Sequence, residues 1–204
     1  MEHLVQNGYP EIAGMEAAEF MRRIEPRKKR IGELARLEKE AKEGRIPFVI
    51  VIKNELVAAE KAMRLVEVEG KRGFTNMDAD DIKRFKPIDG VRIPNGMAYL
   101  AVDIDTGKGT FNVTADGAIK AIRKENRSPL TVDEGVALVT HHPEILRINN
   151  CFSMVGSRRG DRRVTALWIS GDKPRLGWCW SGNSHSWLGS ASCRSRVGLT
   201  SRDG

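Results

Sequence analysis

The spacing of hydrophobic residues changes along the chain, from helical near the N-terminus to strand-like toward the C-terminus. Residues 15–43 carry apolar side chains at helical spacing among Lys, Arg and Glu, with Pro26 marking a break and a restart. The runs PFVIVIK (47–53) and MAYLAVDID (97–105) are short, apolar and bounded by turn residues, which is typical of buried strands. These patterns predict N-terminal helices followed by core strands.

Two further helices are predicted before the C-terminal quarter. The helix over 114–124 begins at a Thr, which is a suitable N-cap. Thr131 and Glu134 have the capping-box spacing and precede a helix that ends near His141. Because adjacent side chains on a helix point about 100° apart, His141 and His142 are not expected to share a metal. A histidine at this end of the helix is expected to stabilise the helix terminus instead.

Strand-like runs and tight turns alternate in residues 151–193. The runs CFSMVGS, RRVTALWIS and PRLGWCW are joined by RGD and GDK, which predicts an antiparallel β-meander. Leu176, Trp178 and Trp180 share one face of their strand, so this face is predicted to lie in the core. Trp187, in the following loop, is predicted to be the tryptophan exposed in a pocket.

Together these elements predict an α+β fold in a single domain over residues 1–193. Residues 11–45 are its helical N-terminal part, and residues 46–150 are a mixed α/β part with a mixed or antiparallel central sheet. Residues 151–193 form the basic, Trp-rich C-terminal antiparallel β-meander. The polar stretch 194–204 has no apolar periodicity and is predicted to be a flexible tail.

Composition narrows the class of protein and its compartment. The chain of 204 residues is 40% hydrophobic and 30% charged, which is ordinary for a folded protein. No apolar run is long enough to span a membrane, and the N-terminus lacks the pattern of an export signal. Three cysteines, an odd number, favour free thiols over a disulfide framework. We therefore expect a cytoplasmic protein without a membrane partner.

Positive charge is concentrated in the C-terminal quarter. Of the net charge of +7, residues 151–204 contribute +6 through nine Lys or Arg against three Asp. Four arginines flank the turn between the first two strands of the meander, and their planar guanidinium groups match the geometry of phosphate and carboxylate. The candidate binding residues are these arginines and three residues of the loop after the third strand: Arg158, Arg159, Arg162, Arg163, Asn183, His185 and Trp187.

The charge of this cluster favours one functional hypothesis. We expect a non-enzymatic module that binds an anionic ligand, either nucleic acid or a phosphorylated or carboxylated small molecule. The competing interpretation of the same residues is a solvated hairpin tip above a core filled with tryptophan.

A cysteine nucleophile is the enzymatic alternative. Cys179 with His185 could serve a hydrolase or a transferase, because a thiol needs a nearby base to become a thiolate at neutral pH. A zinc site made of Cys151, Cys179, His185 and Cys193 is disfavoured, since their separations are irregular and no C-x-x-C pair is present. No metal is predicted, and the sequence identifies no cofactor.

An interaction scaffold is the third hypothesis. The predicted helix over 27–43 places Ile31, Leu34 and Leu37 on one narrow apolar stripe that could bind a partner. Such a stripe more commonly packs on its own domain. A homodimer is compatible with either arrangement.

Three long segments carry a resemblance. SPLTVDEGVALVTHHPE (128–144), NNCFSMVGSRRGDRRVTALWIS (149–170) and KPRLGWCWSGNSHSWLGSASC (173–193) resemble a family of uncharacterised bacterial proteins, a domain of unknown function. The likeness extends over roughly residues 90–193. It implies one intact domain and assigns no activity and no catalytic residue.

Overall fold

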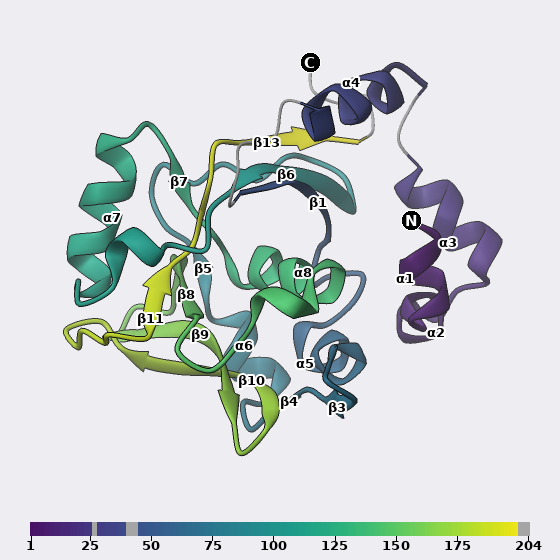
Figure 1. Cartoon of the computed structure of the whole chain (residues 1–204). Coiled ribbons are helices and arrows are strands. Elements are labelled where there is room, and N and C mark those ends of the chain that lie inside the picture. Colours follow the sequence, from purple (N-terminus) through teal and green to yellow (C-terminus); the bar gives the residue numbers. More distant parts are fainter. Residues whose placement is uncertain (26–27, 40–44, 200–204) are drawn as a thin grey trace.

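Helix α8 (Val132–His141) lies between two β-sheets, which explains why eight of its ten residues are buried (Figure 1). The computed structural model describes residues 1–25, 28–39 and 45–199. Within them, α8 packs on β1 on one side and on β8 on the other. The approach to β8 is so close at Gly135 that a Cβ there would lie 2.5 Å from the side chain of Met154. Helix α8 is thus the centre of the core.

The helices of the described residues are mostly short. They are α1 (Glu2–Gln6), α2 (Tyr9–Ala13), α3 (Ala17–Ile24), α4 (Lys28–Lys39), α5 (Ala59–Ala62), α6 (Ala79–Lys83), α7 (Ala115–Lys124) and α8, with 3₁₀ turns η1 (Met63–Leu65), η2 (Lys108–Thr110) and η3 (Pro143–Ile145). Among the residues described, none of these helices has the length and apolar character needed to cross a membrane.

Two principal sheets account for most of the strands. The strands are β1 (Ile46–Ile52), β2 (Glu67–Val68), β3 (Lys71–Arg72), β4 (Phe74–Thr75), β5 (Lys86–Pro87), β6 (Ala98–Ile104), β7 (Ser128–Pro129), β8 (Cys151–Arg158), β9 (Arg163–Ser170), β10 (Lys173–Trp180), β11 (Leu188–Ser190), β12 (Ser192–Cys193) and β13 (Ser195–Gly198). The first sheet has the order β1-β6-β13 and is antiparallel. The second has the order β11-β8-β9-β10-β4, with β5 beside β8. It is mixed, because β11 is parallel to its neighbour β8 and β4 is parallel to its neighbour β10.

The local sequence signals predicted the main elements well. The two predicted core strands are β1 and β6, and the two predicted helices are α7 and α8. Thr131 and Glu134 form the capping box in which each side chain binds a backbone N–H at the start of α8. Strands β8, β9 and β10 form the antiparallel meander. The predicted α+β class is confirmed.

The helices predicted over 15–43 are α3 and α4, whereas residues 26–27 and 40–43 of this prediction lie outside the described residues. In α3, Phe20 and Ile24 are buried in the main core. In α4, Leu34 and Leu37 pack against the same core. This packing favours the interpretation that the apolar stripe contacts its own domain.

The C-terminal segment differs from its prediction as a flexible tail from residue 194. Ser195–Gly198 form β13, which pairs with β6, and Leu199 is buried. The prediction is wrong here because the stretch shows no apolar periodicity, and its main anchor is an arginine whose partner lies 62 residues away. Residues 200–204 lie outside the described residues.

That anchor is the buried ion pair between Glu134 of α8 and Arg196 of β13. The carboxylate of Glu134 is fully buried and accepts hydrogen bonds from Arg196 Nε at 2.5 Å and Nη2 at 2.8 Å. It also accepts from the Tyr99 hydroxyl of β6 at 2.9 Å and from the backbone N–H of Thr131 at 2.7 Å. Although burial opposes the charged guanidinium, Glu134 raises the pKa of Arg196. One carboxylate therefore connects α8 with two strands of the first sheet.

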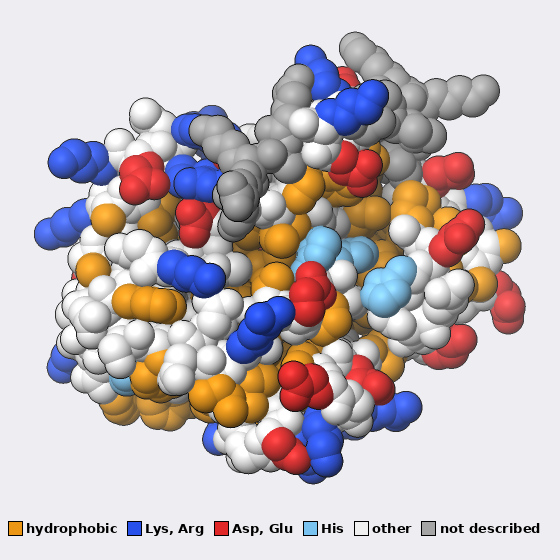
Figure 2. All heavy atoms as spheres, viewed as in Figure 1, with side chains coloured by type: hydrophobic (Ala, Val, Ile, Leu, Met, Phe, Trp, Pro, Cys, Tyr) orange, Lys and Arg blue, Asp and Glu red, His pale blue; other side chains and the backbone are white. Residues whose placement is uncertain are grey.

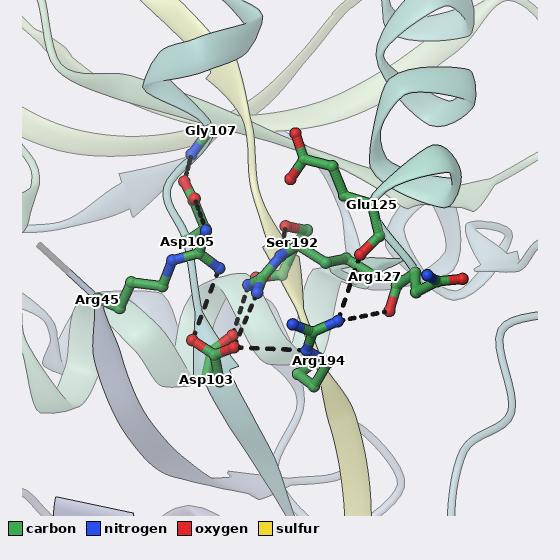
Figure 3. A network of polar contacts seen from close by, with 9 residues as sticks. Arg45, Asp103, Asp105, Gly107, Glu125, Arg127, Ser192 and Arg194 are labelled. Carbon is green, nitrogen blue, oxygen red and sulfur yellow. Dashed lines mark hydrogen bonds and ion pairs between the residues drawn. The ribbon is translucent and has the colours of Figure 1, made fainter. Parts of the chain in front are cut away.

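A second polar network holds the end of β6 (Figure 3). Arg127 is buried and donates to Asp103 Oδ2 at 2.9 Å and to Ser192 Oγ at 2.8 Å. Arg45 Nη2 lies 3.1 Å from Asp105 Oδ2. Both carboxylates of the Asp-Ile-Asp run are thus paired with arginines, and the network joins β6 to β12 and to the segment after α7.

Replacement of Arg196 by Met should lower the free energy of unfolding by about 3–5 kcal/mol, because it leaves the charge of Glu134 buried without its partner. Arg194→Met is the matched control. The side chain of Arg194 is half exposed, and its Nε lies as far as 3.8 Å from Asp103 Oδ2. The loss of this weak pair should lower the free energy of unfolding by about 1 kcal/mol or less. Urea unfolding at pH 7 measures both. Equal losses in the two variants would contradict the central role of the buried pair.

Candidate functional site

Two arginines of the β8–β9 hairpin share two carboxylates. Arg163 donates to Asp161 Oδ2 through Nε at 2.9 Å and through Nη2 at 2.8 Å. Arg159 Nε lies 3.0 Å from the same oxygen, and its guanidinium also pairs with Asp81 of α6. The hydrogen bond from Arg163 holds the pKa of Asp161 below its ordinary value. These two guanidinium groups therefore belong to a local charge network.

The other two arginines of the cluster differ in their surroundings. Arg158 Nη2 lies 2.7 Å from Asp116 Oδ1 in α7. Arg162 is exposed and, within the described part of the chain, has no carboxylate partner. Its carbonyl accepts the backbone N–H of Ser181 at 2.7 Å, and its Nη2 would lie 2.8 Å from a Cβ at Gly182. The cluster thus meets the start of the predicted loop and keeps one guanidinium without an ion pair.

The three loop residues of the predicted site are divided between the surface and the core. Asn183 is exposed and donates its backbone N–H to the carbonyl of Trp180 at 3.0 Å. The rings of His185 and Trp187 lie with centroids 5.1 Å apart, and Trp187 packs against the main core. The carbonyl of His185 accepts the backbone N–H of Asn112 at 2.9 Å. Trp187 is therefore partly buried packing, and the prediction of an exposed Trp187 is wrong.

The tryptophans of β10 show the opposite deviation. Trp178 and Trp180, predicted to lie in the core, are 36% and 48% exposed. Cys179, between them, faces the other side of the sheet, where it packs with Val164 beneath α7. The predicted alternation is correct, but at this point of the strand the covered face is the one that carries the cysteine.

The reason lies in where the covering elements end. Leu176 is on the same face as the two tryptophans and is fully buried. Trp178 and Trp180, two and four residues further along the same face, are exposed, so the cover of this face ends after Leu176. Strand β4, which pairs with β10 only at Arg175 and Leu176, ends beside the same residue and leaves the edge of β10 unpaired by β4 beyond it.

Two exposed indole rings meet a guanidinium group there, on a surface that we call the Trp–Arg surface and define as Arg163, Trp178 and Trp180; the exposed Arg162 precedes Arg163 in the chain. Arg163 is the cross-strand partner of Trp180, and its Cζ lies 5.2 Å from the centroid of the Trp178 ring. The two indoles lie edge to face with centroids 4.9 Å apart. Figure 2 shows hydrophobic side chains gathered at the lower left, over β10. Such a surface suits a planar, anionic ligand.

The cysteines lie in surroundings that favour neutral thiols. Burial raises the pKa of Cys179 to about 11 and that of Cys193 to about 12, and it also raises the pKa of Cys151. A catalytic thiol needs the opposite shift, toward the thiolate. All three are free thiols, and among the described residues no group of three or more His, Cys, Asp or Glu is arranged to hold a metal ion.

Iodoacetamide at pH 7.5 should therefore label each of the three thiols at least about tenfold more slowly in the folded protein than in the urea-unfolded chain. His185→Ala should leave the rate at Cys179 unchanged, because His185 contacts Trp187. Mass spectrometry of the labelled peptides gives the three rates separately. Rapid labelling of Cys179 that disappears in His185→Ala would instead favour the Cys/His nucleophile.

Three histidines gather in a hollow at the centre of the face shown in Figure 2, beside hydrophobic side chains. They line a cavity of about 410 Å³ between α1, β1 and the end of α8: His3, His141 and His142. His3 Nε2 lies 3.0 Å from the carbonyl of Thr140, and His141 Nε2 lies 3.1 Å from that of Ile50. Burial lowers the pKa of His141 to about 4, so its ring is neutral at neutral pH. The first contact docks α1 on α8, and the second joins α8 to β1.

A different cavity, of about 230 Å³, opens beside the first turn of α8. Its polar lining includes Lys53, Lys86, Tyr99, Asp133 and Ser157, which come from five separate segments of the chain. We call it the α8 cavity. The sequence alone does not reveal it, because no two of these residues stand within a common motif.

Asp133 is the unusual group of the α8 cavity. Burial raises the pKa of its carboxyl to about 7 from an ordinary 3.8, and Glu55 and Glu134 add to this effect. The backbone N–H of Asn54, which donates to Asp133 Oδ2 at 3.1 Å, and the charge of Lys53 act in the opposite direction. The carboxyl therefore takes up a proton near neutral pH.

This shift predicts a pH dependence of stability. Between about pH 4 and pH 7 the unfolded chain releases the proton of Asp133 while the folded chain keeps it, so this group stabilises the fold less as pH rises. Asp133→Asn removes the effect, since an amide oxygen still accepts the N–H of Asn54. As pH rises from 4.5 to 8, the free energy of unfolding of the variant should increase by about 2–4 kcal/mol relative to that of the parent protein. This range allows for the N-terminus of α8, which favours a negative charge on Asp133. Urea unfolding at both pH values tests this; an unchanged difference would contradict it.

Comparison with known proteins adds the family alone. A family model described as "Family of unknown function (DUF5701)" matches residues 3–199. This match agrees with the resemblance found in the sequence to an uncharacterised family. No curated protein and no solved structure matches the chain.

Proposed function

Since the chain belongs to this family of unknown function, we propose from its own surface that it is a non-enzymatic module that binds single-stranded nucleic acid on the Trp–Arg surface. The observation that carries the proposal is the exposure of Trp178 and Trp180 beside Arg163. Large aromatic side chains are usually packing residues, and exposed ones interleaved with arginine are characteristic of platforms on which bases stack.

The chemistry of each group suits a nucleotide. The exposed indole of Trp180 offers a ring on which a base can stack without regard to its sequence. Arg163, held by two hydrogen bonds to Asp161, fixes the orientation of Trp178 before any ligand arrives. Arg162 supplies an exposed guanidinium for a phosphate. Stacking and one or two phosphate contacts are thus available within one small area.

The charge balance of the hairpin limits what kind of binding to expect. Arg158, Arg159 and Arg163 are neutralised in part by carboxylates, so the hairpin tip is less positive than its sequence suggests. Binding should accordingly depend strongly on stacking and only modestly on salt. A duplex, whose bases are already stacked on one another, should bind less well than a single strand.

Loss of the exposed ring tests the stacking contribution. Trp180→Ala should weaken the binding of a fluorescein-labelled oligothymidylate by about 1–3 kcal/mol, that is by roughly 5- to 150-fold. Fluorescence anisotropy at low salt measures the dissociation constant. Ile148→Ala is the matched control, because Ile148 is another strongly exposed large apolar side chain, at 74%, and lies outside the meander strands. It should leave the affinity unchanged.

Removal of the guanidinium groups tests the phosphate contribution. Arg162→Ala/Arg163→Ala should weaken binding of the same oligonucleotide and reduce the slope of log affinity against log salt by about 0.7 for each phosphate that the variant no longer neutralises. Arg147→Ala, an exposed arginine after η3, is the control. The proposal fails if the parent protein does not bind the oligonucleotide at low salt, or if neither Trp180→Ala nor the double variant changes the affinity.

A further inference from the structure

The α8 cavity shares none of its lining residues with the Trp–Arg surface, and its chemistry is that of a small-molecule site. A cavity of about 230 Å³ has room for more than a single water, whose share of liquid volume is about 30 Å³. Cavities of this kind, with apolar walls and a few convergent polar groups, are the usual form of ligand sites. The charge and polarity of the walls decide which ligand such a cavity selects.

The charges of the cavity select an anion. Lys53 follows β1, Lys83 ends α6 and Lys86 begins β5, so lysines from three elements line one space. Lys83 is also paired with Asp80, whose Oδ1 lies 3.7 Å from its Nζ. The carboxylates of the lining are Glu55 and Asp133. The lining therefore carries one net positive charge with both carboxylates ionised, and two when Asp133 is protonated.

The remaining walls select a ligand with an apolar part. Ile82 and Phe85, from α6 and the residues after it, are buried against the cavity, and Val132 of α8 is buried on the opposite side. The hydroxyl of Ser157, almost fully buried, accepts the backbone N–H of Val132 at 3.2 Å. It can still donate its own proton to an oxygen in the cavity.

We propose that the α8 cavity is a binding site for a small organic anion, in which an oxyanion head group contacts Lys53 and Lys86 and a short apolar body lies against Phe85 and Val132. The head group is a carboxylate or a phosphate monoester, which share the oxyanion chemistry that the lysines and the Ser157 hydroxyl recognise. The site is independent of nucleic-acid binding at the Trp–Arg surface.

The titration of Asp133 makes this site sensitive to pH. Asp133 faces Lys53 and Glu55 from the β1–α5 connection and Glu134 from its own helix. The lining also includes Lys83 of α6, Lys86 of β5 and Tyr99 of β6, whose hydroxyl donates to Glu134. Proton uptake by Asp133 removes one negative charge from the lining, so a bound anion is favoured as pH falls from 8 to 6.

Three matched probes identify the head group: benzoate, phenyl phosphate and the neutral benzamide. Isothermal titration calorimetry of the full chain at pH 6 should show at least one of the two anions binding about tenfold or more tightly than benzamide. The better anion identifies the head group as carboxylate or phosphate. Equal binding of all three probes, or binding of none, overturns the proposal.

Variants locate the site. Lys53→Met and Lys86→Met should each weaken the preferred anion about tenfold, whereas Lys71→Met, an exposed lysine paired with Asp172, should not change it. Lys86 is exposed, so its variant should keep the fold even if Lys53→Met does not. Asp133→Asn should keep at pH 8 the affinity that the parent protein has at pH 6. Unchanged affinity in both lysine variants would overturn the assignment, and Trp180→Ala, which disrupts only the other surface, should leave anion binding intact.

Discussion

The buried carboxylate of Glu134 is the interaction on which the rest of the structure depends. It caps α8, accepts the hydroxyl of Tyr99 and pairs with Arg196, which in turn donates to Ser128 Oγ at 2.6 Å and to the carbonyl of Pro129 at 2.9 Å. A charge in this position is tolerated only because every oxygen is hydrogen-bonded. The helix start, β6, β7 and β13 are therefore held in one relative position.

The position of α8 in turn determines the cavity beside it. Thr131 and Val132 are fixed by the capping box and by the Ser157 hydroxyl, so the next residue, Asp133, projects beside Lys53 and Asn54 after β1. The packing of α8 buries the carboxyl group of Asp133, and burial raises its pKa. The chemistry of the α8 cavity is thus a consequence of how the helix is anchored, which is why a structural ion pair and a candidate ligand site occupy the same turn.

The Trp–Arg surface has the opposite origin, since it forms where packing stops. Strand β10 extends past the elements that cover Leu176, and its last residues carry two tryptophans into solvent. On the other face α7 partly buries Cys179, which raises the pKa of its thiol and disfavours the thiolate. Strand β10 therefore presents two exposed indole rings on one face and packs the other face against α7. Because α7 covers the face with Cys179, the binding hypothesis is favoured over the enzyme hypothesis.

Local signals in the sequence were sufficient to predict most of the long helices and strands. Periodicity and capping predicted β1, β6, α7, α8 and the antiparallel meander, because these signals depend on residues within one or two turns of each other. The sequence also identified the arginine cluster, but composition counts charges and not their partners, and Asp81 and Asp116 lie far from that cluster in the chain. Three features follow from the tertiary fold instead: which face of β10 is covered, the strand formed by the segment with Arg196, and the raised pKa of Asp133. Each of these depends on contacts between residues tens of positions apart, which local periodicity does not encode.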